Sequence, residues 1–131
     1  MAVPIAEVRA GLAAMLEAVP EVHIYPEMPD SPVAPALAIR LVSSITYATG
    51  QQPYDVILIP VACLVSRPDA IRGQRALDEL VAGVEDALLG PEPSSPIERL
   101  SLVETTNYRV EQPGSASYMT ADVRVEVWTC R

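Results

Sequence analysis

Residues 118–129, YMTADVRVEVWT, carry the clearest strand pattern in the chain. Apolar and charged side chains alternate over its middle, with Ala121, Val123, Val125 and Val127 set between Asp122, Arg124 and Glu126. Successive side chains of a strand point to opposite faces, so one face is expected in a core and the other toward solvent. Residues 97–110 supply a partner strand, and Pro113-Gly114 marks the turn. The sequence therefore predicts a C-terminal β-hairpin.

Two helices are predicted ahead of this hairpin, because apolar residues recur there at three- and four-residue steps. The first stripe is Ile5, Val8, Leu12, Leu16 and Val19, and the second is Leu77, Leu80, Val81, Val84 and Leu88. Pro4 suits the first turn of a helix, and Pro20 places the end of the first helix near residue 19. Ser66 with Asp69 resembles a capping box for the second helix, and Gly90-Pro91 ends it.

Three strands are expected between the helices. Residues 22–25 form a short one, and an alternation that begins at Ala36 forms the second. The third, residues 55–65, is apolar at nearly every position, as in a strand covered on both faces. Pro60 within it requires a bulge or an edge. The predicted fold is α+β, a mixed and largely antiparallel sheet flanked by two helices in the order α-β-β-β-α-β-β, as one domain over residues 1–131.

Composition limits the classes of function. With 17 acidic and 9 basic residues, the net charge of -8 disfavours a broad surface for nucleic acid. Cys63 lies in an apolar run and Cys130 next to the C-terminus, so free thiols are expected. Residues 1–7 lack the features of a signal peptide, and the longest apolar run is too short to span a membrane.

The sequence offers few residues for catalysis. His23 is the only histidine, and its neighbours carry no triad signature. It is expected at the surface, and Cys63, among apolar neighbours, as a buried structural thiol. Metal, dinucleotide and phosphate-loop motifs are absent from the sequence. We therefore predict a protein that is not an enzyme and uses no cofactor or metal.

Charges on the second helix suggest an interface. Arg72 and Arg75 lie toward its start and Glu85 and Asp86 toward its end, opposite to what the helix dipole favours, at a cost of about 0.3–1 kcal/mol per exposed charge. Either partners within the same chain or a neighbouring subunit would neutralise these charges.

Two polar loops, residues 48–53 and 109–117, are flanked by tyrosines. Loops often carry binding residues, and tyrosine offers a large contact area with a polar tip. The candidate contact residues in and beside them are Tyr47, Gln51, Gln52, Tyr54, Tyr108, Glu111, Gln112 and Tyr118. The alternative is that these tyrosines complete the cross-strand packing of two hairpins.

The chain resembles the tail terminator proteins of long-tailed, siphovirus-type bacteriophages. The resemblance covers nearly the whole chain and lies in the opening helix of residues 5–18, VPEVHIYPEMPDSPVAPALAIRL (19–41), SRPDAIRGQRALDELVAGVEDAL (66–88) and YMTADVRVEVW (118–128). It implies a virion structural protein, assembled in the host cytoplasm, that caps the tail tube as a hexameric ring and stops tube polymerisation. The implied partners are the tail tube protein and a neck or head-tail connector protein, with DNA passing through the lumen without specific binding.

Two other functions stay open at this point. A head-completion or neck protein that joins head to tail would also be small, acidic and ring-forming. A small ligand-binding domain or enzyme would instead use His23 or Cys63. Binding to tube protein, binding to portal or adaptor protein, and a monomer with a closed polar pocket distinguish the three.

Overall fold

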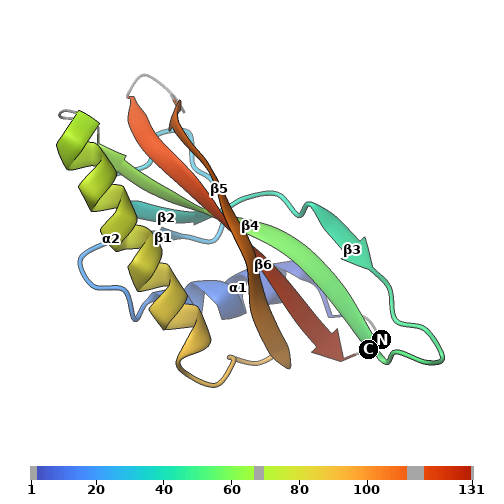
Figure 1. Ribbon diagram of the computed structural model, residues 1–131. Coiled ribbons are helices and arrows are strands. Elements are labelled where there is room, and N and C mark those ends of the chain that lie inside the picture. Colours follow the sequence, from blue (N-terminus) through green and yellow to red (C-terminus); the bar gives the residue numbers. More distant parts are fainter. Residues whose placement is uncertain (1–2, 67–69, 112–116, 131) are drawn as a thin grey trace.

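The computed structural model describes residues 3–66, 70–111 and 117–130, which form two helices and six strands (Figure 1). In chain order these are α1 (Ile5–Leu16), β1 (His23–Tyr25), β2 (Ala36–Ile39), β3 (Ser44–Thr46), β4 (Tyr54–Ser66), α2 (Ala70–Leu89), β5 (Arg99–Glu111) and β6 (Tyr118–Cys130). The predicted α+β class is confirmed. The predicted capping box at Asp69 and the predicted turn at Pro113-Gly114 lie outside the described residues.

The strands form one mixed sheet in the order β1-β2-β4-β6-β5, and β3 also pairs with β4. β1 and β2 are parallel, and every other pair is antiparallel. The long ladder between β4 and β6 runs from the pair Tyr54 and Cys130 to the pair Ser66 and Tyr118. This is the longest ladder of the sheet, and in Figure 1 α2 lies along it.

The second predicted strand is divided into β2 and β3, so four strands and not three separate the helices. Pro60 of β4 lies opposite the break. Its carbonyl accepts a hydrogen bond from Arg40 N at 2.9 Å, and β3 begins only at Ser44. The nitrogen and carbonyl of one antiparallel strand residue face the same neighbour. The missing N–H of Pro60 therefore faces the irregular segment 40–43, which agrees with the predicted bulge.

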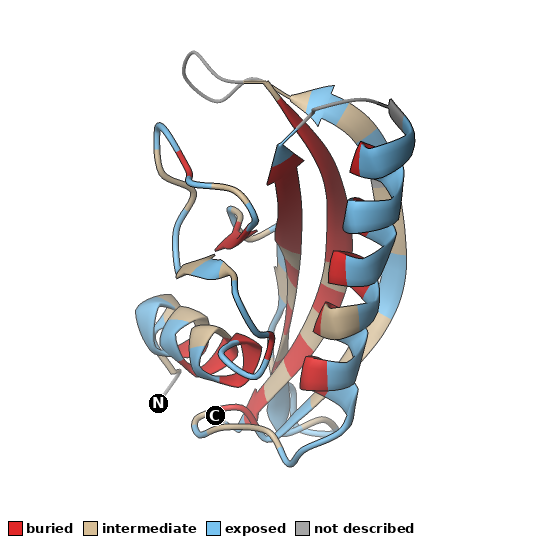
Figure 2. Cartoon of the chain, turned by 90° about the vertical axis from the view of Figure 1, so that its left-hand side faces the viewer, coloured by how far each residue is buried: buried red, intermediate tan, exposed pale blue. Residues whose placement is uncertain are grey.

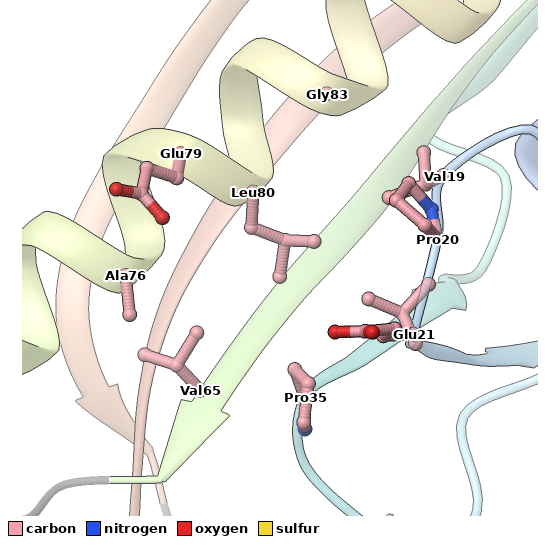
Figure 3. Close-up of a pocket in the computed structure, with 10 residues that line it drawn as sticks. Val19, Pro20, Glu21, Pro35, Val65, Ala76, Glu79, Leu80 and Gly83 are labelled. Atoms are coloured by element: carbon pink, nitrogen blue, oxygen red, sulfur yellow. The ribbon is translucent and has the colours of Figure 1, made fainter.

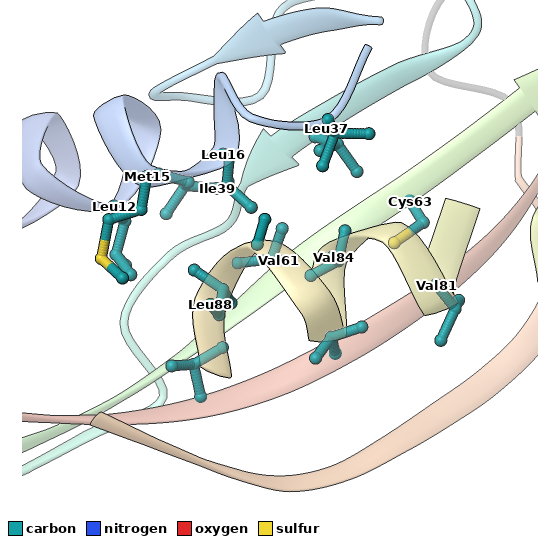
Figure 4. Close-up of a cluster of buried hydrophobic side chains, with 14 of the residues drawn as sticks. Leu12, Met15, Leu16, Leu37, Ile39, Val61, Cys63, Val81, Val84 and Leu88 are labelled. Atoms are coloured by element: carbon teal, nitrogen blue, oxygen red, sulfur yellow. The ribbon is translucent and has the colours of Figure 1, made fainter. Parts of the chain in front are cut away.

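Both helices pack on the same face of the sheet. Their apolar stripes share one core with alternate residues of the strands (Figure 4). The fully buried members from α1 and α2 are Val8, Leu12, Leu16, Leu77 and Val84, and those from β2, β4 and β6 include Leu37, Ile39, Ile59, Val61, Cys63, Val123, Val125 and Val127. Figure 2 shows this burial on the sides of the helices that point to the sheet. α1 ends at Leu16, a turn earlier than predicted, yet Val19 is still buried.

A second, smaller apolar cluster lies apart from this core. It contains Ala36, Ala38, Ala62, Leu64 and Tyr118. Tyr25, Met28 and Ala34, from β1 and the proline-rich segment that follows it, pack against the cluster. The proline-rich segment after β1 thus covers one end of the sheet face that the helices leave open.

Candidate subunit and partner interfaces

The described residues next to the two polar loops lie at opposite ends of the sheet. The first precedes Tyr54, which pairs with Cys130, while the second precedes Tyr118, which pairs with Ser66. A ladder of 13 residues separates the two positions, about 40 Å at 3.2–3.4 Å per residue. The residues beside the two loops are therefore far enough apart to contact different partners.

The first loop is held by its own hydrogen bonds. Thr49 Oγ1 accepts hydrogen bonds from the backbone N–H groups of Gln51 at 3.2 Å and Gln52 at 3.0 Å. Buried Asp55 accepts one from Ala48 N at 2.7 Å, and Gln52 Nε2 donates to Tyr54 O at 2.9 Å. The loop is thus shaped before any partner arrives, which lowers the entropic cost of binding.

Beside this loop lies an open cavity of ≈ 540 Å³. Its lining combines the loop with the ends of β5 and β6: Gln51, Gln52, Pro53, Tyr54, Glu98, Arg99 and Trp128. The Arg99 guanidinium carbon lies 4.5 Å from the centroid of the Trp128 ring, a cation–π contact. Sequence reasoning missed Arg99 and Trp128, because their pairing appears only once the register of β5 against β6 is known.

The residues that flank the second loop are less available than predicted. Tyr118 is only 6% exposed, and its hydroxyl donates a hydrogen bond to Pro32 O. This tyrosine packs within the chain, as the cross-strand alternative had it. Gln112 lies outside the described residues. Tyr108 is half exposed, and its pKa is raised to about 12 by partial burial and then by a hydrogen bond with Asp78 of α2.

Glu111 belongs to an ion network on the open face of the sheet. Its carboxylate accepts hydrogen bonds from Arg40 at 3.0 Å and from Arg109 at 2.7 Å. Arg40 Nε also donates to Asp122 Oδ1 at 2.8 Å, and an Arg109 nitrogen lies 3.5 Å from Asp122 Oδ2. Burial lowers the pKa of Arg40, but the two carboxylates outweigh this effect and raise it. The network joins β5 and β6 to the segment that follows β2.

The charges of α2 are placed as predicted. Arg72, Arg75, Glu85 and Asp86 are all exposed, and the helix has neither an acidic residue in its first turn nor a basic residue in its last. Among the described residues, no ion pair involves Arg75, Glu85 or Asp86. Of the two alternatives from the sequence, partners within the same chain therefore gain no support for these three.

The candidate catalytic residues do not share a site. His23 is exposed and stacks on Tyr25, with ring centroids 6.4 Å apart. Cys63 is buried in the main core, where burial and then the charge of Asp122 raise its pKa to about 12. A thiol with such a pKa is protonated at neutral pH and is a poor nucleophile.

A second cavity, of ≈ 350 Å³, lies between α2 and the segment that follows α1 (Figure 3). Its walls are mostly apolar, with Val19, Val65 and Leu80 among them, and Glu21 and Glu79 supply the carboxylates. Within residues 3–66, 70–111 and 117–130, no group of three or more His, Cys, Asp or Glu side chains could hold a metal ion. No helix in these ranges has the length and hydropathy to cross a membrane.

No protein-family model matches the chain, and no curated protein matches it. Among solved structures, it is similar to a chain of one described as "Virion of native gene transfer agent (GTA) particle". The TM-score is 0.69, and the match covers 97% of each chain at 15% sequence identity. At this identity the match shows a shared fold over the whole length of both chains.

Proposed function

We propose that this protein is a structural component of a phage-like virion that caps the tail tube as a ring and presents a surface to the neck or head. The single observation that carries the proposal is the fold shared with a virion chain over 97% of both chains. The resemblance of the sequence to tail terminators points to the same role.

The placement of the two loops supports a junction role. A protein that ends a tube and joins it to a neck needs two separate contact regions, one for each partner. Tyr54, next to the first loop, and Tyr118, next to the second, are separated by the full length of the β4–β6 ladder. The ordered first loop, with its neighbouring Arg99–Trp128 pair, is our candidate for one contact, and the end near Glu111 is our candidate for the other.

Charge also fits this role. The net charge of -8 is repeated in every subunit of a ring, so passing DNA would meet an acidic protein. His23 and Cys63 lie in environments that do not activate them, which favours a structural role over catalysis.

Tube assembly in the presence of the protein tests the proposal. Purified tube protein is polymerised with and without this chain, and tube lengths and ends are measured by electron microscopy. Capping predicts shorter tubes with a ring at one end. Unchanged tube lengths, together with binding to portal or adaptor protein, would instead identify a neck protein.

Two substitutions make the test specific. His23→Ala and Cys63→Ser are expected to keep capping activity, since neither residue has a catalytic environment. Loss of activity in a His23→Ala protein that still folds and assembles would contradict the structural role and support a ligand-binding or enzymatic one.

A further inference from the structure

The outward face of α2 has an ordered pattern of side chains. Arg75 and Asp86 are 11 residues apart, about three helical turns, so they point in nearly the same direction. Ile71 and Leu89 are 18 residues apart, about five turns, and share a direction close to that of the first pair. The core residue Val84 lies on the opposite side of the helix. One exposed stripe therefore runs through Ile71, Arg75, Asp78, Ala82, Asp86 and Leu89, apolar at both ends and charged between them. Asp78 hydrogen-bonds Tyr108 of β5, so the charges left for a partner are the basic Arg75 and the acidic Asp86.

The exposure of this stripe confirms its direction. Ile71 is 65% and Leu89 58% exposed, so both apolar side chains are available to a partner. Arg75 and Asp86 are exposed as well. Ala82, between the charges, is a small residue that allows a neighbouring helix to approach closely.

The stripe is complementary to itself when it is reversed. Both pairs are centred on residues 80–81 of the helix. An antiparallel copy of α2 would therefore place Arg75 against Asp86 of the second helix, and Ile71 against its Leu89. Each contact would occur twice about a two-fold axis, as in other isologous interfaces. The unfavourable charges at the helix ends would then be neutralised between the two chains.

We propose that the outward face of α2 docks antiparallel against the same face of a second copy of this chain. Charge complementarity and the matched apolar ends identify the occupant as a second copy. A two-fold contact closes after two chains, so it is distinct from the head-to-tail contacts that build a ring. It joins two subunits before ring assembly, or two rings face to face. One helix pair buries little area, so the dimer is transient and forms at high protein concentration.

Charge reversal on α2 tests the proposal. Arg75→Glu and Asp86→Arg each place like charges together in the dimer, and each is expected to raise the dissociation constant about tenfold or more. The double variant Arg75→Glu/Asp86→Arg keeps the net charge and restores both ion pairs in reversed order. Its dissociation constant should return to within about threefold of the wild-type value. Sedimentation at a series of protein concentrations measures all four proteins.

Two controls separate docking from other effects of the substitutions. Glu27→Arg reverses an exposed carboxylate outside α2 and should leave the dissociation constant unchanged. Ile71→Ser/Leu89→Ser weakens the dimer without a change in charge. Circular dichroism confirms that each variant is folded.

Three results would overturn the proposal: a strict monomer at about 1 mM wild-type protein, singly reversed variants that associate like the wild type, or a folded double variant that does not recover. The tube-capping assay reports independently on the proposed function. Capping by a protein that never dimerises through α2 would refute this contact alone, and a dimer that does not cap would refute the proposed function alone.

Discussion

The two faces of the β4–β6 ladder are made by alternate residues of the same strands, yet their surroundings differ. Toward the helices, Val123 and Val125 are fully buried in an apolar core. On the other face, Asp122 and Arg124 of the same strand make ion pairs with groups from neighbouring segments. The period of two in residues 118–129 therefore sets both the core and the polar network. Helix packing decides which face, here called the dry face, is closed to solvent.

The largest expected effect comes from placing a charge on the dry face. Val123→Asp buries a carboxylate without a partner, and we expect a loss of more than about 4 kcal/mol in the free energy of unfolding. This is most of the stability of an ordinary domain, so the variant should be largely unfolded. Urea unfolding followed by circular dichroism measures the change.

The same substitution at an exposed valine is the matched control. Val103 of the edge strand β5 is 48% exposed, and Val103→Asp should change the free energy of unfolding by less than about 1 kcal/mol. Equal losses at the two positions would show that burial of Val123 in the core does not cause the loss.

The second prediction concerns the polar network of the open face. Asp122→Ala removes one of the two carboxylate partners of Arg40 and a neighbour of Arg109, and Arg40 is only 20% exposed in its side chain. We expect a loss of about 1–3 kcal/mol, since Arg40 Nε loses its acceptor while the guanidinium keeps only Glu111. Glu104→Ala, which breaks the more exposed pair with Arg124, should cost less than about 1 kcal/mol. A network without stabilising effect would give similar small losses for both.

How far the sequence predicts the structure can be judged from these same residues. The spacing of apolar residues predicts both helices and the closing hairpin, because an element that is buried on one face repeats its apolar residues at a fixed interval along the sequence. The ion pair of Arg40 with Asp122 joins residues 82 positions apart and depends on strand order, so no local pattern shows it. The division of β2 from β3 was missed for a related reason: residues 40–43 are irregular because they lie opposite Pro60.

For the candidate contact residues, the sequence predicts the exposure of some side chains and not of others. The exposed charges of α2 and the polar side chains of the first loop lie at the surface, as their residue types suggest. Tyr118 looked like a loop residue, but the proline-rich segment covers it through a contact 86 positions away. Its burial could not be deduced without knowing where that segment runs.

A third prediction tests this covered end of the open face. Tyr118→Phe removes the hydroxyl that donates to Pro32 O and leaves that carbonyl without its partner. We expect a loss of about 0.5–1.5 kcal/mol in the free energy of unfolding. Tyr54→Phe, at an exposed tyrosine near the first loop, should leave stability unchanged within error. If the two substitutions had equal effects, the proline-rich segment would not be a real part of the packing.

The smallest effect is expected on the helix that covers the dry face, and it is a gain. A methyl group at Gly83 would lie 3.5 Å from Val19 Cγ1, an ordinary packing distance. Alanine is favoured over glycine within a helix by about 0.8–1 kcal/mol, so Gly83→Ala should stabilise the protein by about 0.5–1 kcal/mol. At Gly73 a methyl group would lie 2.3 Å from Met119 Sδ, so that buried side chain must move and the gain is lost. Thermal unfolding should therefore show a higher midpoint temperature for Gly83→Ala than for the wild type, and no increase for Gly73→Ala. Equal midpoints for the two variants would mean that α2 lies no closer to the sheet at Gly73, in its first turn, than at Gly83, in its fourth. That result would contradict the close approach of Gly73 to Met119 at this end of the dry face.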